Sequence, residues 1–137
     1  MRVLLDTHVF LWWLYESLRL SARVREVLAD GSNTLLFSSA SVWALIIKIQ
    51  SGKLRIPEEP EAFIVGRLAL HSMDSLSVKL EHAVRVYTLP AHHKDPFDRI
   101  LVAQALGRGY RSLRPTRRLP AIRLRSYGEP DYLIRSR

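Results

Sequence analysis

Short apolar runs alternate along the chain with longer stretches of helical periodicity, and this alternation restricts the possible folds more than any other feature. The runs at 2–5, 34–38 and 71–76 have the length of strands. The stretches between them carry apolar residues at the three- and four-residue spacing of helices. Strands that alternate with helices are typical of α/β proteins with a parallel sheet. We therefore predict a three-layer α/β fold in which a parallel sheet of about four strands is flanked by helices.

Local signals indicate where the helices begin and end. Ser, Asp and Pro are favoured at helix starts because they satisfy or remove free backbone N–H groups. Gly52 is well placed to end the helix that runs to about Gln50. The strongest start is Asp-Pro, with Asp as N-cap and Pro at the first helical position. The predicted starts are Ser21, Ser38 to Ser41, Pro57, Ser77 and Asp95.

The positive charge is concentrated at the C-terminal end. Residues 1–107 hold 12 basic and 11 acidic side chains, whereas residues 108–137 hold nine arginines and only two acidic residues. This segment shows no apolar run long enough for a core strand, although 121–122 and 132–134 are fragments of one, so the last strand stays doubtful. A basic segment of this kind binds phosphate backbones or is simply a solvated surface, and the sequence leaves both readings open.

The chain contains no cysteine, which excludes disulfides and thiolate-bound zinc and suits a reducing cytoplasm. Its apolar first 14 residues are interrupted by Asp6 and His8 and are too short to span a bilayer. They also lack the small-residue cleavage site of a signal peptide. We therefore expect a cytoplasmic protein without a membrane segment.

Three aspartates that are distant in sequence are expected at one edge of the sheet. Asp6 follows the first strand, and Asp95 and Asp98 lie at the start of the helix that runs to about residue 106. In parallel α/β sheets the carboxyl ends of the strands and the N-termini of the following helices share one edge. Clustered carboxylates repel each other unless a cation neutralises them, and their oxygens suit Mg²⁺ or Mn²⁺. The pattern therefore indicates metal-assisted hydrolysis of a phosphodiester.

Each aspartate also has a structural explanation when it is taken alone. Asp6 and Asp95 can act as helix caps, and Asp98 in a first helical turn favours the helix dipole. The adjacent histidines at 92 and 93 are expected in an exposed loop, and the three tryptophans, at 12, 13 and 43, in the core. Spacing alone therefore leaves both the metal site and the structural roles open.

Three blocks of sequence resemble the PIN-domain toxins of the VapC type. The first is Met1-Arg2-Val3-Leu4-Leu5-Asp6-Thr7-His8, and the second is Ser38-Ser39-Ala40-Ser41-Val42-Trp43 with Ile46-Ile47-Lys48. The third and most specific runs from Leu89-Pro90-Ala91-His92-His93-Lys94 through Asp95-Pro96-Phe97-Asp98-Arg99 to Ala103-Gln104-Ala105. The blocks stand in the expected order and cover about residues 1–107, so we expect a PIN domain there.

The resemblance implies Mg²⁺-dependent cleavage of RNA by a protein paired with an antitoxin. Of the four acidic positions in the family, the first matches Asp6 and the third matches Asp98, with Asp95 as a close neighbour. The second position, a Glu directly after the Trp of the second block, is Ala44 here. The fourth, an Asp in a Thr-Ala-Asp-like turn, has no counterpart after Gly109. The resemblance thus assigns Asp6 and Asp98 as metal ligands and makes Ala44 a departure.

Both departures bear on activity. Loss of a group that supports a metal site commonly reduces affinity or activity by roughly 10–100-fold, whereas Ala preserves the helix. Ala44 therefore removes chemistry without disturbing the fold, through either deliberate inactivation or natural decay. The atypical Arg-rich segment, 108–137, is explained by a change of reading frame near 107–110 or by partial disorder. An alternative frame encoding the missing turn would support the first explanation.

Two functions follow from these observations. The first is the toxin of a toxin–antitoxin pair, a homodimeric Mg²⁺-dependent endoribonuclease of low activity in this form. The alternative is a catalytically inactive PIN protein that binds an antitoxin or nucleic acid. A phosphatase is a weaker third reading, because no motif for a small-substrate pocket is present.

Overall fold

The computed structural model describes residues 1–90, 95–106, 121–123 and 132–134. In chain order the elements are β1 (Arg2–Leu5), α1 (Thr7–Leu14), α2 (Ala22–Ala29), β2 (Thr34–Ser38), α3 (Ser39–Gln50), α4 (Pro60–Leu70), β3 (Met73–Leu76), α5 (Leu80–Arg85), the 3-10 helix η1 (Val86–Thr88), α6 (Pro96–Leu106), β4 (Ala121–Arg123) and β5 (Tyr132–Ile134). Strands and helices alternate as the sequence predicts.

The strands form one sheet in the order β3-β2-β1-β5-β4. β1 pairs in parallel with β2 and with β5, and β2 pairs in parallel with β3. β4 pairs antiparallel with β5 at the edge of the sheet. The prediction of a parallel sheet of about four strands is therefore confirmed. The doubtful last strand is β5, whose Tyr132 is the register partner of Val3.

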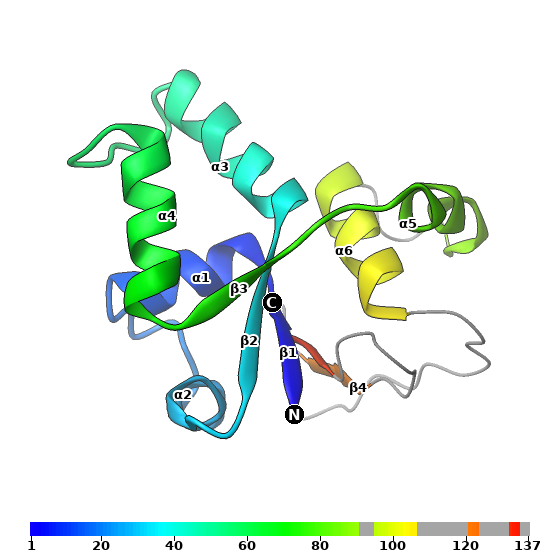
Figure 1. Cartoon of the computed structure of the whole chain (residues 1–137), viewed down its shortest axis with the longest axis horizontal. Coiled ribbons are helices and arrows are strands. Elements are labelled where there is room, and N and C mark those ends of the chain that lie inside the picture. Colours follow the sequence, from blue (N-terminus) through cyan, green and yellow to red (C-terminus); the bar gives the residue numbers. More distant parts are fainter. Residues whose placement is uncertain (91–94, 107–120, 124–131, 135–137) are drawn as a thin grey trace.

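Side chains alternate across β1 and bury both faces of the sheet. Val3 and Leu5 belong to a core cluster with residues of β2, α1, α2 and α3, whereas Leu4 packs with residues of α6. All three side chains are fully buried. The helices α1 to α4 accordingly lie on one side of the sheet and α5 and α6 on the other, as Figure 1 shows. This arrangement confirms the predicted three-layer α/β architecture.

Most helix starts lie where the local signals place them. The hydroxyl oxygens of Ser21 and Ser38 accept backbone N–H groups at the starts of α2 and α3. Two starts were placed wrongly. α4 begins at Pro60, not near Pro57, and α5 begins at Leu80 with Lys79, not Ser77, at the N-cap position. A proline or serine marks an allowed start, but tertiary contacts decide which allowed start is used.

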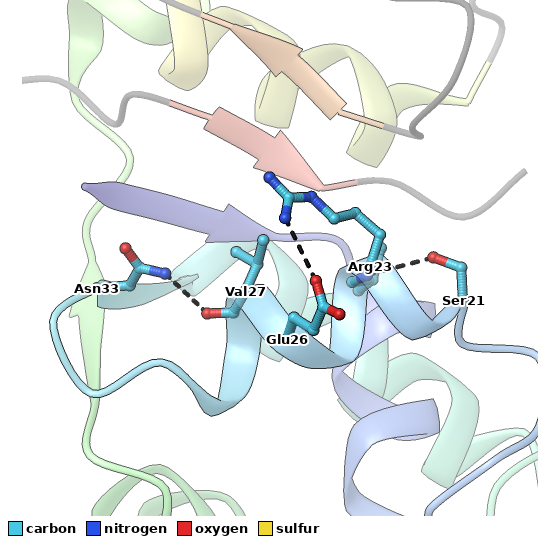
Figure 2. A network of polar contacts seen from close by, with 6 residues as sticks. Ser21, Arg23, Glu26, Val27 and Asn33 are labelled. Carbon is cyan, nitrogen blue, oxygen red and sulfur yellow. Dashed lines mark hydrogen bonds and ion pairs between the residues drawn. The ribbon is translucent and has the colours of Figure 1, made fainter.

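Polar contacts at both ends of α2 join the helix to the segments that precede and follow it (Figure 2). At its start Ser21 accepts from the backbone N–H of Val24 over 3.2 Å. After its end the Asn33 side chain donates to the carbonyl of Val27 over 2.8 Å and accepts from the terminal amine of Met1 over 3.1 Å. Asn33 thus links α2 to the chain end that leads into β1.

The predicted burial of the tryptophans is only partly correct. Trp12 and Trp13 are half-buried and pack against the core. Trp43 is 64% exposed, so its assignment to the core was wrong. It lies on the outer side of α3, where its ring meets that of Phe97.

Several predictions fall outside the described residues. One is the predicted loop position of His92 and His93. The others concern most of the segment 108–137, namely a changed reading frame, partial disorder and a boundary with a domain at 1–107. They stay predictions. None of the helices in the described ranges has both the length and the apolar content that a bilayer crossing requires.

Candidate functional site

The carboxyl ends of β1, β2 and β3 meet at one edge of the sheet. The parallel registers place Leu5 beside Phe37, and Phe37 beside Ser75. The chain passes directly from β1 and β2 into the helices α1 and α3 at this edge. In parallel α/β sheets ligands bind outside these strand ends. This edge is therefore the candidate functional site.

Asp6 lies at this edge, directly after β1, as predicted. Its side chain is 4% exposed. Its carboxylate accepts the backbone N–H of His8 over 3.4 Å and so caps α1. Burial of a carboxylate is costly unless hydrogen bonds or a cation compensate it. The cap supplies part of that compensation, so Asp6 combines a structural role with a position suited to a ligand.

Asp95 and Asp98 lie at the start of α6. The carboxylate of Asp95 accepts the backbone N–H groups of Phe97 over 2.8 Å and of Asp98 over 3.2 Å. Asp95 is therefore the N-cap that the sequence predicts. Asp98 is half-buried in the first turn of the helix. Asp95 thus serves as a helix cap, and Asp98 lies within the first turn of the helix that Asp95 caps.

Ala44 lies in the middle of α3 and is 9% exposed. Its neighbour Trp43 packs edge-on against Phe97, the residue before Asp98, with 5.3 Å between the ring centroids. This contact holds the segment of α3 that contains Ala44 beside the first turn of α6. A longer side chain at position 44 would therefore start close to the helix turn that carries Asp98.

A buried hydroxyl near Ala44 has no partner. Ser41 is fully buried, and its Oγ has no hydrogen bond to any described residue. Ser41 and Ala44 are three positions apart, so they lie on the same side of α3. Most buried polar groups are hydrogen-bonded, and exceptions need a specific explanation. A carboxylate at position 44 would place an acceptor on the same side of α3 as this hydroxyl.

The described residues do not complete a metal site. Among them, no group of three or more His, Asp or Glu side chains lies close enough together to hold an ion. The predicted cluster of Asp6, Asp95 and Asp98 is thus not found as a three-ligand group. Asp6 and Asp95 are used as caps, and position 44 supplies no oxygen. The described part of the chain therefore supplies an incomplete set of ligands for a divalent cation.

A buried polar network fixes α6 against this edge of the sheet. Ser38 at the end of β2 donates to the Gln104 side-chain oxygen over 2.6 Å. The Gln104 amide donates to the carbonyl of Ser77, just after β3, over 3.3 Å. Both Ser38 and Gln104 are fully buried. One side chain of α6 thus joins two strand ends and sets the position of the helix that carries Asp98.

The sequence pattern does not predict this role of Gln104, which belongs to the third family block only by position. The available signal was a single amide within an otherwise apolar helical stretch, 101–106. A polar side chain at a buried helical position must find partners. The sequence could not show that these partners are Ser38 and Ser77, because both lie far away along the chain.

A family model described as PIN domain matches residues 3–113. This range includes β1 to β3 and all six α-helices of the described structure. No curated protein matches the chain.

Replacement of Gln104 by Leu should destabilise the protein by about 1–3 kcal/mol, because the hydroxyl of Ser38 and the carbonyl of Ser77 lose their partner inside the protein. The double variant Gln104→Leu with Ser38→Ala should cost less than the sum of the single variants, since both ends of one bond are removed together. Urea denaturation of the four proteins measures this coupling. Strict additivity would mean that the bond contributes nothing.

Asp95→Ala should lower the free energy of unfolding by about 1 kcal/mol, because α6 loses its N-cap. Asp95→Asn should keep nearly full stability, since Asn caps as well as Asp. Thermal or urea denaturation compares the two variants. Equal losses would show that the charge of Asp95, and not its cap, stabilises the helix.

Proposed function

The chain belongs to the PIN-domain family, whose members are typically metal-dependent nucleases, and we propose that it is the toxin of a VapC-type toxin–antitoxin pair. Its substrate would be RNA, cleaved as an endoribonuclease in the cytoplasm. The activity of this form would be low, because position 44 carries no carboxylate.

The geometry around Ala44 carries this proposal. The Trp43–Phe97 contact holds this part of α3 next to the turn that carries Asp98. The hydroxyl of Ser41, which has no hydrogen bond to a described residue, lies on the same side of α3 as Ala44. Ala44 itself is buried and favourable in a helix. The surroundings thus suit a carboxylate that the chain lacks, while the fold does not depend on it.

Asp6 and Asp98 are the proposed ligands of Mg²⁺ or Mn²⁺, with Asp95 assisting through its cap of α6. A divalent ion at such a site lowers the pKa of a bound water and polarises a phosphoryl oxygen. Two carboxylates leave most of the coordination of the ion to water, which favours weak binding. Low occupancy would therefore limit the activity of the present chain.

The second candidate is a PIN protein without catalytic activity that binds an antitoxin or nucleic acid. The observation that favours it is the absence of a three-ligand group among the described residues. The two functions differ in one respect, since only the first predicts that a single carboxylate restores cleavage.

An apolar stripe on α5 and η1 supports a protein partner. Leu80, Val84 and Tyr87 are 83%, 66% and 94% exposed and follow the spacing of one helix face. On the inner side, Arg85 donates to the carbonyl of Ala103 in α6 over 3.0 Å, which holds α5 with this stripe outward. Exposed apolar patches mark interaction surfaces. We propose that this stripe forms the interface of the homodimer and that the antitoxin binds at the acidic edge.

Ala44→Glu should raise Mg²⁺-dependent cleavage of single-stranded RNA by roughly 10–100-fold, because it adds a carboxylate beside the turn that carries Asp98. Ala44→Gln is the matched control, since it has the same shape without the charge. Cleavage of a labelled RNA with Mg²⁺ and with EDTA measures the effect. Equal rates for the two variants would contradict the proposal and favour the non-catalytic alternative.

The double variant Leu80→Lys with Tyr87→Lys should be monomeric, because two charges would have to be buried in the dimer interface. Leu18→Lys is the control, since Leu18 is 98% exposed in the segment between α1 and α2. Light scattering after size-exclusion chromatography measures the mass of each protein. A monomeric unmodified protein at micromolar concentration would contradict the assignment of the stripe.

A further inference from the structure

Beside the acidic edge, α1 presents two rings that lie one turn apart. His8 is exposed, and Trp12 is half-buried because part of its ring packs on the core. The ring centroids are 6.2 Å apart and the planes are tilted by 43°. Neither ring is needed to cap or terminate the helix. The outer side of α1 therefore offers accessible aromatic surface that the candidate active site does not use.

Two cations flank these rings. The Lys48 ammonium, from the last turn of α3, lies 3.2 Å from Nε2 of His8. The Arg19 guanidinium lies 5.9 Å from the centroid of the Trp12 ring, at the outer limit of a cation–π contact. The four side chains thus follow one another in the order Lys48, His8, Trp12 and Arg19. The two aromatic rings thus lie between two cations, and none of the four side chains is acidic.

The two cations are not neutralised by the described part of the chain. Its salt bridges are Arg23–Glu26 and Arg67–Glu58. Lys48 and Arg19 therefore keep their charge available for a ligand. The positive charge of this row distinguishes it from the acidic edge nearby and suits an anionic partner.

The row of side chains begins at the candidate active site. The backbone N–H of His8 donates to the Asp6 carboxylate. Lys48 lies four positions after Ala44, so it projects from the same side of α3 as the position of the missing carboxylate. A ligand bound along the row would therefore have one end at the acidic edge.

We propose that the row is a binding subsite for single-stranded RNA, formed by Lys48, His8, Trp12 and Arg19. This proposal rests on the proposed nuclease function. Lys48 and Arg19 contact phosphates, and a base stacks on the accessible face of Trp12. Positive side chains that track a backbone, combined with aromatic rings on which bases stack, are the usual means of binding single strands. An acidic peptide would use the cations but would gain little from the ring.

The subsite contains no metal ligand, so it does not depend on the missing carboxylate. RNA binding and RNA cleavage are therefore separable in this chain. The protein with Ala44 should hold single-stranded RNA in the absence of divalent ions, even though it cleaves slowly.

The test is fluorescence anisotropy of a labelled 12-nucleotide single-stranded RNA in EDTA, so that no cleavage occurs. Lys48→Gln should weaken binding several-fold and reduce the slope of log affinity against log salt by roughly 0.7. Trp12→Leu should weaken binding by about 5-fold or more. Lys79→Gln is the matched control, since Lys79 is an exposed lysine beside α5, on the other side of the sheet, and it should change neither quantity. The arginines of 108–137 are present in every variant and contribute equally.

A second measurement does not depend on the stability of the Trp12 variant. The unmodified protein is crosslinked with ultraviolet light to the same RNA carrying 4-thiouridine, and the crosslinked peptide is identified by mass spectrometry. Crosslinks within 7–19 support the subsite. Crosslinks confined to 108–137, or equal affinities for Lys48→Gln and Lys79→Gln, overturn it.

The outcomes for the subsite and for the nuclease function can be told apart. If Ala44→Glu cleaves RNA but Lys48→Gln binds it as tightly as the control, the subsite is wrong and the nuclease function stands. If Lys48→Gln weakens binding but Ala44→Glu stays inert, the subsite stands and the protein binds RNA without being a nuclease. Loss of affinity for an acidic peptide, with no change for RNA, would assign the row to a protein partner and overturn the proposal.

Discussion

The burial of β1 on both faces is the constraint on which the rest of the structure depends. Val3 and Leu5 face one layer of helices and Leu4 faces the other, and none of them is exposed. A strand covered in this way needs parallel neighbours joined by helical crossovers, because a hairpin cannot return the chain in the same direction. Crossovers bring the carboxyl ends of the parallel strands β1, β2 and β3 to one edge. The position of Asp6 at the same edge as the start of α3 is therefore a consequence of core packing.

Sequence reasoning succeeded where the determining contacts are local. The caps at Ser21 and Asp95 involve residues two or three positions away, and both were predicted. It failed where distant residues decide. α5 does not start at Ser77, whose carbonyl receives the Gln104 amide from another helix. Trp43 is exposed because its partner is Phe97 and not the core. Neither contact leaves a trace in the local pattern.

The candidate site shows the same division. The topology predicted that Asp6 follows β1 at the carboxyl edge, where the structure places it, and the family resemblance identified position 44. The sequence could not show that Ser41 is buried without a hydrogen bond to any described residue. Nor could it show that Lys48 of α3 contacts His8 of α1. The acidic residues lie at element boundaries, which are readable in a sequence. The side chains around them belong to element interiors, where orientation depends on the packing of several helices.

The strand order has a consequence for how the protein is made. β2 follows β1 after about 30 residues, but the register partner of Val3 on the other side is Tyr132. One side of β1 therefore stays unpaired during synthesis until β5 has been translated. Unpaired strand edges recruit other chains. The nascent protein thus carries an unpaired strand edge during synthesis, and a lesion that removes β5 would leave that edge permanently unpaired.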